Sequence, residues 1–195
     1  MQYELNTPCT AADLAPLKAG DTVLLSGVVY TARDQAHKRM LEALDRGEKL
    51  PFDLEGSAIY YVGPTPERPG EVIGSAGPTT SGRMDAMSPR LLDLGNKIMI
   101  GKGKRDAAVK EAVVRNGAVY LAALGGAGAL MAQSVQTLEV IAWPGPRLRG
   151  RPPPDRGKNA ADSHPRRPRR RPLRGRPGGL SRNGKMTKLR RVELV

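Results

Sequence analysis

Short apolar runs without strict alternation recur along the first 144 residues and predict strands that are buried on both faces. They read TVLLS at 22–26, SAIYYVG at 57–63, NKIMI at 96–100, AVYLA at 118–122 and LEVIA at 138–142. Runs of this length, bounded by Gly, Pro and polar residues, are typical of a parallel sheet covered by helices. Residues 3–5 and 71–73 predict two further short strands.

Apolar residues at three-to-four spacing between these runs predict helices. The first predicted helix is capped by Thr31 and carries the apolar stripe Ala36, Met40 and Leu44. The second begins at Arg83, and its inward positions are Met84, Met87, Leu91, Leu92 and Leu94. The third spans 106–116, with Ala108, Val109, Ala112 and Val113 inward, and the fourth spans 129–135. Strands that alternate with helices predict an α/β fold. In such folds ligand groups lie where a strand turns into a helix.

One such turn concentrates polar chemistry in nine residues, GPTTSGRMD at 77–85. Its Gly-Pro pair marks a turn, and Thr79, Thr80 and Ser81 are good N-cap residues. Backbone N–H groups at a helix start, together with the guanidinium of Arg83, suit an anion. An ordinary helix cap after a turn explains the stretch equally well.

Two more cations lie at equivalent turns. Arg33 is close to the start of the first helix, and Lys102 is flanked by glycines after the strand at 96–100. If the strands share one sheet, Arg33, Lys102 and the Thr79–Arg83 group converge at one edge, which would suit a small dicarboxylate. The alternatives are a surface Arg33 paired with Asp34 or Glu42, and a solvated Lys102; the Walker A spacing is absent.

The net charge of +13 comes from the C-terminal segment. Residues 1–144 contain 15 Lys and Arg against 16 Asp and Glu, whereas residues 145–195 contain 17 against 3. The first part is therefore a near-neutral domain whose site cannot be inferred from the overall charge. The single cysteine, Cys9, excludes an internal disulfide and an iron–sulfur cluster held by this chain's own thiolates.

No apolar run reaches 18 residues and no secretory signal is visible, so we expect no membrane span and a cytoplasmic location. His37 could serve as an acid or base near neutral pH. A lone histidine at the start of a helix is more often structural or exposed.

Five motifs in order, TARDQAHKR (31–39), YYVGPTP (60–66), GPTTSGRMD (77–85), IGKG (100–103) and GGAGAL (125–130), resemble the C-terminal domain or β subunit of class I fumarases and L-tartrate dehydratases. The resemblance covers residues 1–144 and implies a three-layer β/β/α domain of the swivelling type. It also implies an α subunit that carries a 4Fe-4S cluster, in an α2β2 hetero-oligomer. The implied reaction is the reversible dehydration of malate to fumarate, with tartrate as the alternative substrate.

The resemblance also implies roles for the cationic turns. Arg33, Arg83 and Lys102, with Thr80 beside them, would bind the substrate carboxylates, and Thr79 would be the catalytic base. Arg83 and the helix N-terminus would favour the alkoxide of Thr79. Without the partner's iron, we expect the isolated chain to be inactive.

Residues 145–195 depart from the family pattern and are rich in Arg and Pro, for example HPRRPRRRPLRGRPGG. Proline and the shortage of apolar residues predict disorder. Three interpretations are open: an arm that binds nucleic acid through phosphates, a solvated extension without a role, and a GC-rich gene read in another frame. We favour a gene read in another frame, which resequencing around codon 145 would test. An arm that binds nucleic acid would instead make the chain a basic nucleic-acid-associated protein rather than an enzyme subunit.

Overall fold

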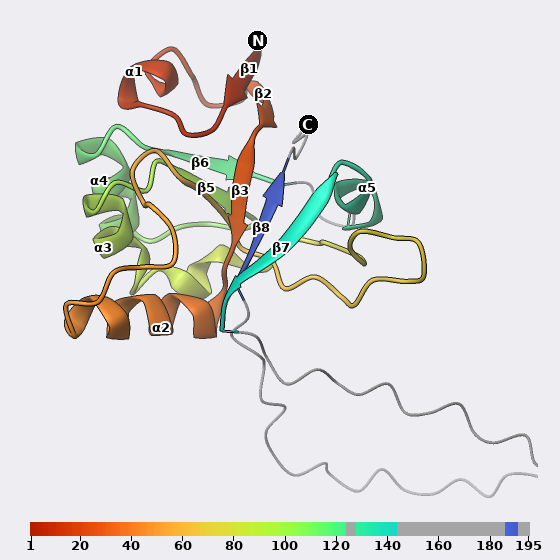
Figure 1. Ribbon diagram of the computed structural model, residues 1–195. Coiled ribbons are helices and arrows are strands. Elements are labelled where there is room, and N and C mark those ends of the chain that lie inside the picture. Colours follow the sequence, from red (N-terminus) through yellow and green to blue (C-terminus); the bar gives the residue numbers. More distant parts are fainter. Residues whose placement is uncertain (124–127, 144–185, 191–195) are drawn as a thin grey trace, which may run out of the picture.

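A computed structural model describes residues 1–123, 128–143 and 186–190, which form two sheets and six short helices (Figure 1). The larger sheet has the strand order β6-β5-β4-β3-β8-β7, and the smaller one pairs β1 with β2. Strands β3 to β6 are parallel, and β8 is antiparallel to both of its neighbours. The strands are β1 (Gln2–Asn6), β2 (Thr22–Ser26), β3 (Val28–Thr31), β4 (Ala58–Tyr60), β5 (Ile98–Gly101), β6 (Val119–Ala122), β7 (Thr137–Ala142) and β8 (Met186–Arg190).

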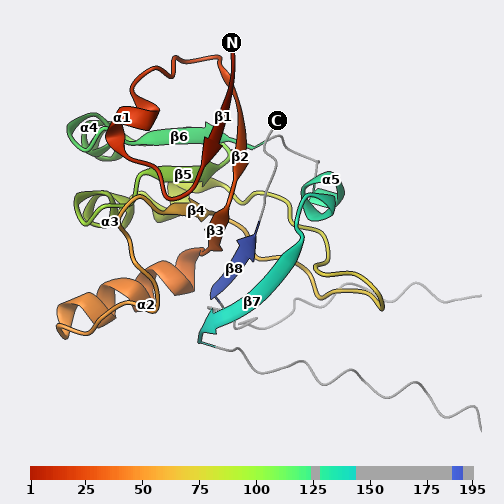
Figure 2. The same cartoon turned by 45° about the horizontal axis from the view of Figure 1, so that its top comes forward.

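Helices and the small sheet cover opposite faces of the six-stranded sheet. Figures 1 and 2 show α2, α3 and α4 together on one side, with α5 on the other and the β1–β2 sheet above. The helices are α1 (Ala11–Leu14), α2 (Asp34–Asp45), the 3-10 helix η1 (Ser81–Met84), α3 (Ser88–Asp93), α4 (Ala107–Arg115) and α5 (Gly128–Gln133). The predicted α/β class is confirmed, and the described elements form a β/β/α arrangement.

Neighbouring residues within a strand enter different halves of the core. Ile59 and Met99 pack with the α2–α4 layer, whereas Tyr60 and Ile98 pack with the small sheet and α5. All four side chains are buried, because both faces of β4 and β5 are covered. This explains why the central strands show no alternation of apolar and polar residues.

The structure corrects several local predictions. Thr31 ends β3, a strand that the sequence analysis missed, and Arg33 is the N-cap of α2. Residues 71–73 form no strand, and Leu94 follows α3 with 45% of its surface exposed. The helix expected from Arg83 is divided into η1 and α3, because Pro89 in the first turn of α3 favours a new helix start there.

A further difference concerns the first of the four positions of α4 that were predicted to point inward. Ala108 is exposed, while Val109 and Ala112 are buried as expected and Val113 is partly buried. Residues 125–127 of the GGAGAL motif lie outside the described residues.

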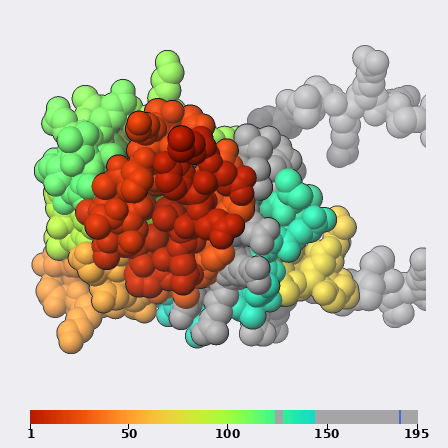
Figure 3. All heavy atoms as spheres, turned by 90° about the horizontal axis from the view of Figure 1, so that it is seen from above, coloured from red at the N-terminus to blue at the C-terminus, as the bar shows by residue number. Residues whose placement is uncertain are grey.

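The segment after β4 crosses the molecule before the polar turn at 77–85. It is held by backbone hydrogen bonds from Thr65 N to Ser75 O at 3.0 Å and from Ala76 N to Gly128 O at 2.9 Å. In Figure 3 the yellow loop from this segment projects beside the atoms of α5 and β7. The loop therefore returns to the sheet edge at a fixed place.

The C-terminal segment contributes one strand. Expected disorder does not hold for β8, which lies between β3 and β7 and whose Met186 is fully buried. The rest of the tail, residues 145–185 and 191–195, lies outside the described residues. Its three interpretations stay predictions.

Within the described part of the chain, no helix combines the length and apolar character needed to cross a bilayer.

The burial of Met186 predicts that β8 stabilises the domain. Met186→Ala should lower the free energy of unfolding by about 2–5 kcal/mol, because it leaves a cavity in the core. Val114→Ala, at a position that is 81% exposed, is the control and should change it by less than about 0.5 kcal/mol. Urea titrations of both variants measure the difference, and equal small effects would show that β8 does not contribute to the core.

Candidate active site

Backbone hydrogen bonds bring the polar turn to the carboxyl ends of β4 and β5. Thr79 N donates to Tyr61 O at 2.8 Å, and Ser81 N donates to Lys102 O at 2.9 Å. Thr80 and Lys102 also form an isolated parallel bridge. Thr79 and Thr80 therefore run between the ends of two neighbouring strands, with the exposed Lys102 beside them.

Arg33 reaches the same edge from β3. Ala32 N donates to Tyr60 O at 3.1 Å, which places Arg33 next to the end of β4. The Arg33 side chain lies over Gly63, where an added Cβ atom would come within 2.8 Å of its Nη1 atom. Because residue 63 has no side chain, the guanidinium can occupy this position.

Asp34, the first residue of α2, contacts both predicted site arginines. Its Oδ1 atom lies 2.7 Å from Arg83 Nε, and its Oδ2 atom lies 3.4 Å from Arg33 Nε. The alternative that Arg33 pairs with Asp34 is thus correct, yet this pairing joins Arg33 to Arg83. Among the described residues, no acidic side chain pairs with Lys102.

The structure therefore brings the five predicted residues to one edge of the sheet: Arg33, Thr79, Thr80, Arg83 and Lys102. Two guanidinium groups, a lysine and two hydroxyls there provide donors for carboxylate oxygens. Their individual roles stay predictions.

A buried ion pair lies under this edge. Arg105, only 7% exposed, donates from Nε to Asp85 Oδ1 at 2.6 Å and from Nη2 to Ser88 Oγ at 2.8 Å. The second oxygen of Asp85 accepts from Asp106 N at 2.8 Å. Asp106 in turn caps α4 by accepting from Val109 N. These contacts tie the segment after Arg83 to the loop after Lys102.

Two tyrosines enclose the same guanidinium. The Arg105 carbon Cζ lies 5.2 Å from the ring centroid of Tyr61 and 5.2 Å from that of Tyr120. Tyr120 Oη is 3.0 Å from Ser81 Oγ and 3.0 Å from Gly103 O. Burial raises the pKa of both phenols, so they stay protonated at neutral pH.

Sequence reasoning assigned no role to Arg105 or Asp85. Arg105 follows GKGK, and a short basic run is usually read as solvated. Asp85 ends the nine-residue turn, but only the fold places it against Arg105. No periodicity in a single sequence would have paired these residues.

His37 is a buried structural residue near the base of Arg33. Its Nδ1 atom lies 3.3 Å from Arg33 O, and its ring meets Tyr61 edge-on with centroids 5.2 Å apart. Burial lowers the pKa of His37 to about 4; the Arg105 charge also lowers it, while the Arg33 carbonyl and Asp34 oppose the shift. The ring is therefore neutral at pH 7, which favours the structural interpretation over an acid–base role.

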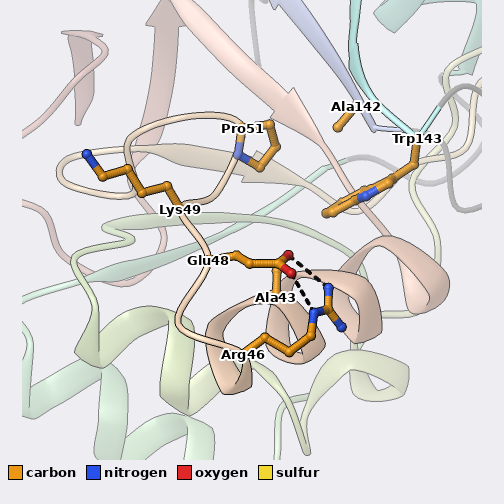
Figure 4. Close-up of a pocket in the computed structure, with 7 residues that line it drawn as sticks. All are labelled: Ala43, Arg46, Glu48, Lys49, Pro51, Ala142 and Trp143. Atoms are coloured by element: carbon orange, nitrogen blue, oxygen red, sulfur yellow. Dashed lines mark hydrogen bonds and ion pairs between the residues drawn. The ribbon is translucent and has the colours of Figure 1, made fainter.

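A small cavity lies away from the site. It encloses about 200 Å³, and Figure 4 shows its lining of Ala43, Arg46, Glu48, Lys49, Pro51, Ala142 and Trp143. These residues adjoin the C-terminal end of α2, whereas Arg33 and Asp34 are at the N-terminal end. A helix of twelve residues is about 18 Å long, so the cavity is separate from the cationic edge.

Metal-binding side chains do not gather in the described part of the chain. No group of three or more His, Cys, Asp or Glu residues there could hold a metal ion. Cys9 is buried, its thiol donates to Asn6 O at 3.4 Å, and burial raises its pKa. It is also the only cysteine of the sequence, so these residues do not fit an iron–sulfur cluster.

Comparison with known proteins identifies the family. The chain belongs to the family described as the fumarase C-terminus, which matches residues 1–146. A Methanocaldococcus jannaschii protein, provisionally named L(+)-tartrate dehydratase subunit beta, is 42% identical over 144 residues, or 72% of this chain and 73% of that protein. The L(+)-tartrate dehydratase subunit beta of Escherichia coli is 34% identical over 146 residues, covering 73% of this chain and 71% of the relative.

Longer relatives match over part of their length only. The aerobic class I fumarate hydratase of Escherichia coli is 36% identical over 148 residues, which are 74% of this chain but 27% of the enzyme. The chain therefore spans about a quarter of these fumarate hydratases and about seven-tenths of the beta subunits. The resemblance noted in the sequence is confirmed, and the curated relatives named here are hydro-lyases.

The Arg105–Asp85 pair predicts a large stability effect. Arg105→Met should lower the free energy of unfolding by about 3–5 kcal/mol, because it leaves the Asp85 carboxylate buried without its partner. Arg115→Met is the matched control, since the Arg115–Asp93 pair is nearly as short, at 2.7 Å, but about half exposed. That variant should lose no more than about 1 kcal/mol. Urea unfolding would contradict the prediction if the free energy of unfolding fell by similar amounts in both variants.

His37 predicts a loss of stability on acidification. The unfolded chain takes up a proton near the ordinary pKa of 6.5, whereas the folded chain does so near 4, so stability is complete above 6.5 and falls as the pH drops through this window. The loss should be about 2 kcal/mol between pH 7 and pH 5. Urea unfolding of His37→Gln, which lacks the titrating ring, should show most of this loss removed. An equal loss in both proteins would assign it to other groups.

Proposed function

We propose that this chain is the β-type part of a class I fumarate hydratase, which dehydrates (S)-malate reversibly to fumarate and water. The observation that carries the proposal is the convergence of Arg33, Arg83 and Lys102 around Thr79, in a family whose relatives include these hydro-lyases. Three cations at one edge of the sheet suit a dianionic substrate.

The three cations would bind and orient the two carboxylates. A guanidinium can grip a carboxylate in two places, whereas the ammonium of Lys102 acts as a mobile point charge. Arg83 and Lys102 are exposed and therefore accessible to a small molecule. Binding at both ends would fix the carbon atom that loses its proton.

Thr79 would take that proton. Removing it from the carbon next to a carboxylate places negative charge on the carboxylate oxygens, and nearby cations stabilise this charge. The hydroxyl on the neighbouring carbon leaves with a proton as water. Thr79 is held by the hydrogen bond from its backbone N–H to Tyr61 O, and a positioned base contributes about 10²–10⁴-fold to the rate.

The cluster belongs to another chain in this proposal. The residues of this chain do not fit one, because Cys9 is its single cysteine and is buried. The relatives named subunit beta belong to enzymes with more than one kind of subunit, which supports an α partner that carries the 4Fe-4S cluster and the acid. We expect an α2β2 assembly whose substrate site is shared between the chains.

Tartrate is the second candidate substrate. The two beta subunits match along about seven-tenths of their length, and both are named for L(+)-tartrate dehydratase. Malate and tartrate differ by one hydroxyl. The described residues at the cationic edge contact the carboxylates in the proposal, and either diacid would satisfy them.

Reconstitution tests the proposal. The full chain is mixed with a cluster-bearing α subunit under anaerobic conditions, and fumarate formation from malate is followed in parallel with tartrate dehydration. We expect activity in the mixture and none in the chain alone. Thr79→Val, which replaces the hydroxyl with a methyl group of similar size, should lower kcat by about 10²–10⁴-fold with an unchanged melting temperature.

The neighbouring lysines of the glycine loop provide the matched control. Lys102→Met should raise KM for the diacid by about 10-fold or more, whereas Lys104→Met should not, because Lys102 is the residue bridged to Thr80. An inactive mixture with an intact cluster would reject the proposal. Equal effects of the two lysine variants would reject the role of Lys102.

A further inference from the structure

We infer that Asp34 is a positioning residue that holds the two substrate-binding arginines in one arrangement. Nothing in the sequence motif assigns it a role beyond that of a surface partner for Arg33. The expected effect of Asp34 on catalysis rests on the proposed function. Its effect on the arrangement of the two arginines rests on the contacts of Asp34 alone.

The contacts of Asp34 use one side of each guanidinium. Its two oxygens lie 2.7 Å from Arg83 Nε and 3.4 Å from Arg33 Nε. A guanidinium presents five N–H donors, and the terminal nitrogens carry four of them. Contact through Nε therefore leaves terminal nitrogens of both arginines available to a diacid.

The start of α2 and its buried anchor residues fix the position of Asp34. Asp34 is the first residue of α2, where the positive end of the helix dipole favours a carboxylate. The helix is anchored by the buried side chains of Ala36 and Met40. Arg33 is confined further by Gly63, which approaches its terminal nitrogen.

Asp34 also connects two elements that carry the site. Arg33 precedes α2, whereas Arg83 lies in η1, far along the sequence. Two guanidinium groups repel each other, and a carboxylate between them offsets this repulsion. Because the side chains of Arg33 and Asp34 are about a quarter exposed, water screens these charges only in part.

A simple charge effect makes the opposite prediction. If Asp34 acted only as a negative charge near the site, its removal would strengthen the binding of a dianion. If Asp34 positions the arginines, its removal separates them and weakens binding. The sign of the change in KM therefore distinguishes the two explanations.

The experiment uses the full chain with its cluster-bearing α partner. Asp34→Asn should raise KM for the accepted diacid by about 10- to 100-fold, a loss like that seen when the hydrogen-bond partners of metal ligands are removed, with kcat changed much less. Asp34→Glu, which keeps the charge, should recover part of this loss. Glu42→Gln is the control on the same helix: Glu42 pairs with Lys38 at 3.8 Å, and its removal should leave KM within about twofold.

A second measurement is independent of activity. In the full chain labelled with nitrogen-15, the Nε–H signals of Arg33 and Arg83 should be protected from exchange by Asp34 and should lose this protection in Asp34→Asn at an unchanged melting temperature. An unchanged or lower KM, or unaltered arginine signals, would overturn the inference. If the wild-type mixture is inactive on both diacids, the proposed function fails, and the arginine signals still decide whether Asp34 positions the pair.

Discussion

The buried ion pair between Arg105 and Asp85 is the constraint on which the cationic edge depends. One partner follows the glycine loop after β5 and the other follows η1, so the pair joins the two segments that carry the predicted site. Separating the two residues would leave a buried charge without its partner, which has a large free-energy cost. The hydrogen bonds of Asp85 to Asp106 N and of Arg105 to Ser88 extend the same constraint to the starts of α4 and α3.

Exposed cations above this buried pair are incomplete as a catalytic site. Arg83 is 41% exposed at its side chain, so water weakens its field at the edge of the sheet. Closing the edge with a second surface would remove that water and strengthen every charge interaction with a bound diacid. In the proposal, the partner chain therefore has two uses: it would hold the cofactor, and its surface would exclude water from the cationic edge.

The sequence predicted the central strands and the convergence of the cations, because both follow from local patterns. Buried strands such as Ile98–Gly101 are short apolar runs, and Arg33 and Lys102 each lie at a turn after a strand. The contact of Asp34 with Arg83 and the pair of Arg105 with Asp85 could not be assigned in the same way, since each joins residues from different elements. The strand β8 could not be predicted for a different reason: its five residues lie in a segment whose composition predicts disorder.

The placement of β8 has a consequence for the order in which the domain is completed. The hydrogen-bonded ladder from β3 to β7 runs through β8, so Val29 and Leu138 are linked only by way of Leu189 in the described sheet. The pairing of β8 with β3 closes a loop of more than 150 residues. Contacts of such separation are slow to form. The parallel strands β3 to β6 pair over much shorter separations and can therefore assemble first, while this side of the sheet depends on the slower contact with β8.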